Sequence, residues 1–278
     1  MRELIQRYWK SIRTRVGTII LLAILLFGFL GPVLSSTDPF EMAGFLYESP
    51  SREHILGTDN FGRDLFTCLI YGTRTSLVVG FLAGIIGTIL GTTIGSFAGY
   101  KGGKIDDILN SITNLFLVVP PFVVLILLSI SLHKRNTFIL AFIIGVTSWP
   151  WVARAVRSQV TSLRAREHVN IAKISGYNTI EILLREILPY IFSYIFMAFI
   201  LQVAIGILNE ATLSMLGLGP YEAISLGGLM HWSLTYEAVR TGAWWAFIPA
   251  VILVALITFS LKYINTGMDE IFNPKLRD

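Results

Sequence analysis

Six long apolar segments limit what this chain can fold into more than any other feature of its sequence. Because a helix needs about 20 predominantly apolar residues to cross the hydrocarbon core of a bilayer, we expect a transmembrane helix over each segment. Composition agrees, since only 14% of the 278 residues are charged, against roughly 25% in soluble domains. The sequence therefore predicts an all-α polytopic membrane protein with six transmembrane helices, over residues 16–34, 76–98, 108–132, 137–153, 190–208 and 243–264.

The distribution of basic residues predicts which loops face the cytoplasm, because Lys and Arg are enriched in cytoplasmic loops. Most of the 22 Lys and Arg residues lie in residues 1–15, in "YKGGK", in residues 154–189 and in the tail from Lys262. This pattern predicts that both termini and residues 154–189 are cytoplasmic, and that residues 35–75 and 209–242 face outward. The loop "HKRN" at 133–136 runs against the pattern.

The chain is expected to form one membrane domain. We interpret residues 1–34 as a cytoplasmic N-terminus and a retained signal-anchor helix, because the apolar segment is long and no small-x-small cleavage site follows it; a removed signal peptide is the alternative. Residues 35–75 are predicted to be an extracytoplasmic segment, and residues 76–264 a five-helix core that contains the cytoplasmic loop 154–189. Residues 265–278 are predicted to be a cytoplasmic tail.

Glycines and prolines inside the predicted spans indicate close packing and kinks. Glycines recur every three or four residues along the second span, which places them on one helical face where another backbone can approach closely. Pro120-Pro121 and Pro150 each remove an amide donor, so the third and fourth spans should kink. The glycines are Gly80, Gly84, Gly87, Gly91, Gly95 and Gly99.

Several kinds of chemistry have no residues to support them in the sequence. No predicted span carries a charged residue near its middle, which disfavours an ion-coupled carrier. The sequence has no H-E-x-x-H motif or phosphate-binding loop, and no Ser-His or Asp pair within the spans, which disfavours a membrane-embedded hydrolase. The four histidines are far apart and Cys68 is the single cysteine, so we expect no metal site and no internal disulfide.

The polar stretch "EHVNIAKISGYNTIEILLREILP" at 167–189 is predicted to form a short helix, a turn and a second helix. Val169, Ala172 and Ile174 suggest an apolar patch on the first helix, and Gly176 permits the turn. In the second helix, Ile180, Leu183, Leu184, Ile187 and Leu188 fall at amphipathic spacing. The residues leave two interpretations open: a helix resting on lipid, or a knob that inserts Ala172 into a cytoplasmic partner.

This stretch resembles the cytoplasmic coupling loop of ATP-binding-cassette importer permeases. That loop has the pattern Glu-Ala-Ala, three residues, Gly, nine residues, Ile, one residue, Leu-Pro. Ala172, Gly176 and Leu188-Pro189 occupy matching positions, whereas Asn170 and Ile171 replace the first two residues of the triplet and Glu186 replaces the isoleucine. The resemblance implies that the segment from Glu167 to Pro189 contacts an ATPase.

A second segment, "ILGTDNFGRDLFTCLIYGTRTSLVVG" at 55–80, is similar to the segment that marks the dipeptide, oligopeptide and nickel branch of these permeases. We expect residues 56–75 to form an ordered outer element, with Thr58 and Asp59 as caps and Arg63 paired with Asp64. The branch motif comprises Gly57, Thr58, Asp59, Gly62, Arg63 and Asp64.

A third segment, "NEATLSMLGLGP" at 209–220, is similar to the branch's outer loop between its last two spans. The following "YEAISLGGLMHW" looks more like members that import oligosaccharides. Its Trp232, with Trp244 and Trp245 of the later "TGAWWAFIPA", could stack on sugar rings or form an aromatic belt at the membrane interface. The candidate gate residues are Glu210, Ser214, Leu216, Gly217, Gly219, Trp232, Trp244 and Trp245.

Together these matches imply a type I ABC importer permease fold and the C-type subunit of a two-permease pair. The expected partners are a homologous permease, two cytoplasmic ATPase subunits and an extracytoplasmic substrate-binding protein in a prokaryotic cell (inner) membrane. ATP and Mg would be bound by the ATPase subunits, so this chain is expected to bind no cofactor and to catalyse no covalent chemistry. The implied cargo is an oligopeptide, an oligosaccharide or a nickel chelate.

Overall fold

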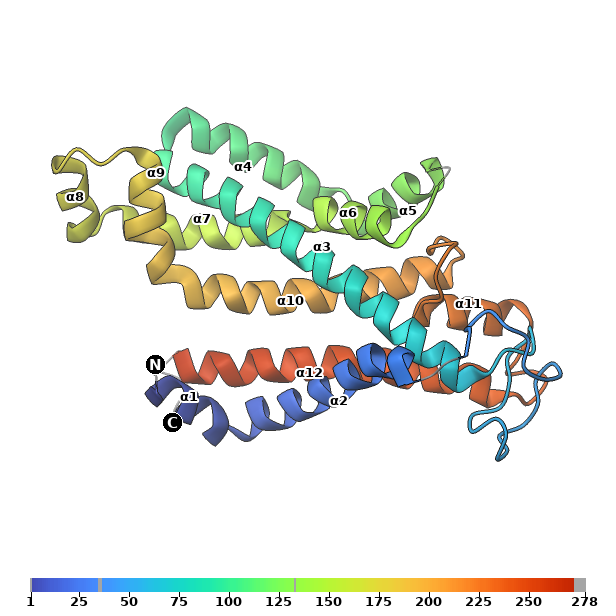
Figure 1. Cartoon of the computed structure of the whole chain (residues 1–278). Coiled ribbons are helices and arrows are strands. Elements are labelled where there is room, and N and C mark those ends of the chain that lie inside the picture. Colours follow the sequence, from blue (N-terminus) through green and yellow to red (C-terminus); the bar gives the residue numbers. More distant parts are fainter. Residues whose placement is uncertain (1, 35–36, 133, 273–278) are drawn as a thin grey trace.

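The computed structural model describes residues 2–34, 37–132 and 134–272, and helices dominate this part of the chain (Figure 1). The helices in order are α1 (Arg2–Lys10), α2 (Ile12–Leu34), α3 (Leu65–Lys101), α4 (Gly103–Val118), α5 (Pro121–Ser131), α6 (Thr137–Ser148), α7 (Pro150–Arg164), α8 (Glu167–Ile174), α9 (Thr179–Glu181), the π-helix η1 (Ile182–Ile187), α10 (Leu188–Met215), α11 (Leu226–Thr235), the 3₁₀-helix η2 (Trp244–Ala246) and α12 (Ile248–Phe272).

The expected transmembrane segments correspond to four long apolar helical stretches and two bent helix pairs in the described residues. Helix α2, helix α3, residues 179–215 and residues 244–272 are each long and apolar enough to span a bilayer. The pair α4 and α5 bends by 82° and the pair α6 and α7 by 45°. The bends fall at Pro120-Pro121 and Pro150, as predicted, but at Pro120 the helix breaks rather than kinks.

Helix α3 is longer than its apolar segment suggests. It has 37 residues and begins at Leu65 rather than near residue 76, so at 1.5 Å per residue it is about 55 Å long. A bilayer core of about 30 Å cannot enclose it. The part of residues 35–75 that follows Asp64 is therefore the first turns of a spanning helix.

The glycine face of α3 is packed against two neighbouring elements, which confirms the predicted close contact. A Cβ atom on Gly84 would lie 2.6 Å from Val203 Cγ2 in α10, and one on Gly91 would lie 2.6 Å from Val152 Cβ in α7. Gly95 and Gly99 likewise abut the backbone of α7. Helix α3 thus joins the α10 side of the molecule to the α6–α7 side.

The ends of the bundle carry different elements (Figure 1). Helices α1, α8 and α9 and the end of α12 lie at one end, which we call the 165–187 end, and residues 37–64 and α11 lie at the other, the 37–64 end. At the 37–64 end Arg135 donates to the Gly217 carbonyl at 3.1 Å and its guanidinium lies over the Tyr221 ring. This basic residue of the 133–136 loop therefore has a structural role, which accounts for its departure from the charge pattern.

Candidate functional site

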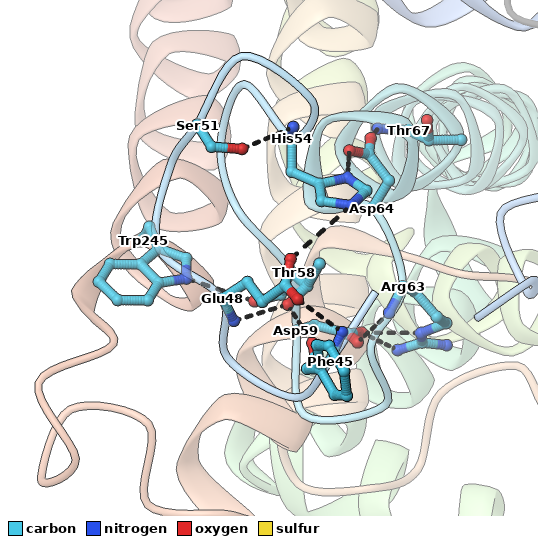
Figure 2. A network of polar contacts seen from close by, with 10 residues as sticks. All are labelled: Phe45, Glu48, Ser51, His54, Thr58, Asp59, Arg63, Asp64, Thr67 and Trp245. Atoms are coloured by element: carbon cyan, nitrogen blue, oxygen red, sulfur yellow. Dashed lines mark hydrogen bonds and ion pairs between the residues drawn. The ribbon is translucent and has the colours of Figure 1, made fainter. Parts of the chain in front are cut away.

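An ion pair inside the branch motif joins Asp59 to Arg63 within residues 37–64 (Figure 2). The Asp59 carboxylate accepts hydrogen bonds from the backbone N–H of Phe61 and Arg63, and its second oxygen lies 2.7 Å from Arg63 Nε and 2.5 Å from an Arg63 terminal nitrogen. Both residues are buried. The expected partner of Arg63 was Asp64, and that prediction is wrong because the turn brings the carboxylate four residues earlier to the guanidinium.

The Thr58 side chain connects the second half of this loop to residues 45–48 in its first half. Its hydroxyl donates to the Phe45 carbonyl at 2.6 Å and accepts from the Glu48 N–H at 2.8 Å, so both capacities of the buried hydroxyl are used. Gly57 and Gly62 have φ of 71° each, and a Cβ on either would meet a backbone carbonyl, of Glu48 and Gly44 respectively. The spacing of the motif is thus set by a turn that only glycine fits at two positions.

Asp64 is the residue that caps α3. Its carboxylate accepts from Thr67 N–H at 2.8 Å, while its other oxygen lies 3.0 Å from His54 Nδ1. The caps predicted from the sequence were Thr58 and Asp59, and the structure corrects both, because helix α3 starts one residue after Asp64. Since the network ends at the N-cap, the rigid loop is continuous with the longest helix of the bundle.

Trp245 connects the loop to the end of the chain. Its indole N–H donates to the Thr58 carbonyl at 3.3 Å, and the side chain is only 9% exposed. Trp232 packs edge-to-face on Phe61 at 5.2 Å, whereas Trp244 is exposed. Of the three tryptophans considered for stacking on a sugar ring, Trp245 is therefore occupied within the fold.

A buried carboxylate lies behind this loop, among α3, α10 and α11. Glu210 is 0% exposed and accepts from the hydroxyls of Ser76 at 2.6 Å and Ser214 at 2.7 Å. Ser76 Oγ in turn accepts from the Leu226 N–H at the start of α11. The sequence placed Glu210 beyond the end of the fifth span, but α10 continues to Met215, so the carboxylate belongs to the helical bundle.

The remaining candidate gate residues shape the loop between α10 and α11. Gly217 has φ of 78°, and a Cβ on Gly219 would press against the Ser214 side chain, whereas Leu216 is exposed. Between this loop, α11 and residues 37–64 there is a pocket of about 350 Å³. Its lining includes Phe61, Arg63, Tyr221 and Trp232. The 55–80 segment and the chain that continues from the 209–220 segment therefore contribute to one surface.

The expected helix–turn–helix occupies the opposite end of the molecule (Figure 1). Helix α8 ends before Gly176, whose φ of 83° and empty surroundings show that backbone conformation, not space, requires glycine there. Asn178 and Glu181 then form a reciprocal capping box, with bonds of 3.0 Å and 2.8 Å. The short helix, the turn and the start of a second helix are therefore confirmed.

The second helix differs from the predicted amphipathic α-helix. After three α-helical residues it widens into the π-helix η1, in which the Leu188 N–H donates to the Leu183 carbonyl. Pro189 follows and has no N–H to donate, which favours a change of hydrogen-bond register at this point. As a result Leu183 and Ile187 are buried, while Ile180 and Leu184 are exposed.

Ala172 faces the interior of the chain. It is 5% exposed and packs with Val169, Ile182 and Leu183 in one apolar cluster. The prediction that Ala172 inserts into a partner is therefore wrong, because Ala172 lies on the face of α8 that η1 already covers. The apolar side chains that α8 leaves for another molecule are Ile171 and Ile174, the latter 88% exposed.

Three comparisons identify the family. Residues 91–278 match the model of the binding-protein-dependent transport system inner membrane component. Over 98% of its length the chain is 33% identical to the dipeptide transport system permease protein DppC of Bacillus subtilis, of which it covers 85%. Over 97% of its length it is 34% identical to the oligopeptide transport system permease protein OppC of Escherichia coli K12, of which it covers 92%. A solved chain of the MetNI methionine ABC transporter matches with a TM-score of 0.55 at 19% identity, over 73% of this chain and 97% of that chain.

The chain belongs to the family of binding-protein-dependent transport system inner membrane components. It is a multi-pass permease component of an ABC importer and not an enzyme. The predicted all-α type I permease fold and the predicted resemblance to the peptide branch are both confirmed.

Sequence reasoning missed several residues that complete these sites. His54 was considered only as a possible metal ligand and Glu48 was not considered, yet both join the network of the branch motif. Gln202 in α10 bonds to Trp151 at 2.9 Å and to the Ser148 carbonyl at 2.9 Å, beside the bend at Pro150. A single Gln inside an apolar span could have predicted hydrogen-bond partners on another helix, because burying an amide without hydrogen bonds is costly.

Proposed function

We propose that this chain is the C-type permease subunit of an ATP-driven peptide importer. It forms the translocation pathway together with a homologous permease, and it couples to two ATPase subunits through the 165–187 end. That end and both termini face the cytoplasm, and the 37–64 end faces the extracytoplasmic binding protein. The names of the relatives support the cargo, and the excess of Lys and Arg supports the orientation.

The observation that carries the coupling role is the pair of exposed isoleucines on a rigid, protruding unit. Ile174 is 88% exposed and Ile171 is 57% exposed, although their neighbours Val169 and Ala172 are buried. Large apolar side chains presented beyond the bundle are typical of an interaction surface. A helix resting on lipid would explain their exposure equally well, so the test must separate the two.

Packing suggests how a movement at this unit reaches the opposite end. Val169 and Ala172 are in the same buried cluster as Ile182, Leu183 and Ile187 of η1, so α8 and η1 should move as one body. Helix α10 follows η1 directly and carries Glu210 near its far end. In this proposal the partner ATPase subunits bind ATP and Mg. When these subunits close on each other, the movement passes through α8 and η1 to α10.

The names of the relatives favour peptides over oligosaccharides as the cargo. Trp245, the most buried of the candidate stacking residues, holds the loop through the Thr58 carbonyl. Trp244 remains exposed and suits an aromatic belt at the membrane interface. Uptake by proteoliposomes that contain the assembled transporter, with a peptide and an oligosaccharide in parallel, tests this choice. Uptake that needs an ion gradient and no ATP would instead support a secondary carrier.

The coupling role is tested with Ile174→Glu. A charge at this position should lower co-purification of the ATPase subunits at least tenfold and abolish peptide uptake, because an unpaired carboxylate would be buried at the contact. Thr161→Glu is the matched control, since Thr161 is exposed on the adjacent α7. Ala172→Glu is unsuitable, because it would disrupt the chain's own core. Normal co-purification and uptake with Ile174→Glu would exclude the docking role.

A further inference from the structure

A long apolar groove lies between the α2–α12 pair and helices α3 and α10. It has a volume of about 760 Å³ and runs from α1 at the 165–187 end toward the middle of the bundle. Leu22 and Phe29 of α2, Phe81 of α3 and Phe196 of α10 line it and remain exposed. The groove is therefore open on the side of the bundle.

The lining offers almost nothing to a polar ligand. The only hydroxyls among the described lining residues belong to Tyr8 and Thr18, and these lie 2.5 Å apart in a hydrogen bond with each other. Water enters a cavity only where it finds two or more polar partners. The occupant of this groove should therefore be a hydrocarbon.

The size of the groove favours a slender occupant. A helix with its side chains is about 10 Å across, so 760 Å³ would enclose only roughly 10 Å of its length. A flexible acyl chain can follow the groove from one end to the other. The groove is thus better matched to a lipid tail than to a transmembrane helix of a partner.

Helix α1 marks the end of the groove at which a lipid headgroup would lie. Tyr8 of α1 lines the groove, and the same helix exposes Trp9 and Lys10. A short helix with basic residues and an exposed tryptophan is typical of the membrane interface. At this end, the exposed charged residues within three sequence positions of a lining residue are the cations Arg7, Lys10, Arg15 and Lys262 and the carboxylate Asp269.

We propose that this groove binds an acyl chain of an anionic phospholipid from the leaflet at the 165–187 end. The chain would lie between α2 and α10, and the headgroup would lie against Lys10 and Arg15. Because the groove lies between the α2–α12 pair and helices α3 and α10, a bound chain would fill a space that side chains leave empty. The ligand is a membrane component and not the cargo, so the proposal does not depend on what is transported.

The test uses a photo-crosslinking amino acid, p-benzoylphenylalanine, in place of Phe199, which lines the groove. The assembled transporter is placed in nanodiscs that contain equal amounts of phosphatidylglycerol and phosphatidylcholine, and the adducts are weighed by mass spectrometry. Phe259 is the matched control, because it is exposed on α12, outside the groove lining, and three residues from the cationic Lys262. We expect mainly phosphatidylglycerol adducts at Phe199. At Phe259 we expect a ratio of phosphatidylglycerol to phosphatidylcholine adducts near one.

A second pair of variants tests the headgroup contact. Lys10→Gln with Arg15→Gln should reduce the enrichment at Phe199 by up to about 25-fold, since each basic side chain near a membrane surface contributes about a fivefold preference for anionic lipid. Leu22→Trp should narrow the groove and lower the adduct yield, while Leu26→Trp, which is outside the lining, should not. A polypeptide adduct at Phe199, no adduct there, or the same lipid ratio at both positions would overturn the proposal.

Discussion

Glu210 of α10 accepts a 2.6 Å hydrogen bond from Ser76 of α3, and Ser76 accepts the backbone N–H of Leu226 at the start of α11. One fully buried carboxylate thus links three helices near the 37–64 end. The 55–80 segment, which contains Ser76, and the 209–220 segment, which contains Glu210, meet at this point. The carboxylate therefore helps to set their relative position.

Glu210→Ala should loosen this junction. It leaves the hydroxyls of Ser76 and Ser214 without their acceptor, at a cost of about 1–3 kcal/mol for each unsatisfied buried group. Glu210→Gln should cost less, because the amide keeps one acceptor oxygen. Thermal unfolding of the purified assembly, with hydrogen exchange of the α11 amides, measures both effects. Wild-type unfolding and exchange in the Ala variant would show that the carboxylate does not hold α11.

The glycine face of α3 should reject even one methyl group. We expect Gly84→Ala and Gly91→Ala to destabilise the fold by about 1–3 kcal/mol each, through overpacking against α10 and α7. Gly228→Ala in α11 is the control, since a Cβ there has its nearest neighbour at 3.4 Å. That change should be neutral or slightly stabilising, because alanine favours a helix more than glycine does. Unfolding temperatures of the three variants provide the measurement.

The Asp59–Arg63 pair should determine whether residues 37–64 are ordered. Asp59→Ala leaves a nearly buried guanidinium without its partner, which typically costs about 3–5 kcal/mol. The change should therefore increase hydrogen exchange throughout residues 45–64. Arg240→Ala breaks an ion pair whose side chains are both largely exposed, and it should leave exchange unchanged. If both variants exchange alike, the buried pair does not order the loop.

Single cysteines can establish the orientation in the membrane. Cys68 is fully buried, so it should not react with a membrane-impermeant maleimide from either side. Phe45→Cys should react in intact cells, because Phe45 is 80% exposed at the 37–64 end. Thr161→Cys, at an exposed position on α7 outside the proposed ATPase contact, should react only after the membrane is opened. The reverse pattern would show that the cytoplasmic and outer faces have been exchanged.

The sequence alone determined the features that depend on local composition. Apolar segments of sufficient length indicated the spans, Pro150 and Pro120-Pro121 indicated the bends, and the glycine period indicated a close contact on α3. Gly176 indicated the turn between two helices. Each of these follows from the residues themselves, because chain length, backbone freedom and amide donors are local properties.

Tertiary structure alone decided which groups meet. The sequence placed Arg63 beside Asp64, but the turn gave it Asp59, and it assigned Ala172 to a partner although η1 already covers it. Glu210 and Ser76 are 134 positions apart, and no periodicity relates them. Burial and hydrogen-bond pairing depend on how α3, α10 and α11 pack together, and therefore on contacts between distant residues that a reading of local pattern cannot supply.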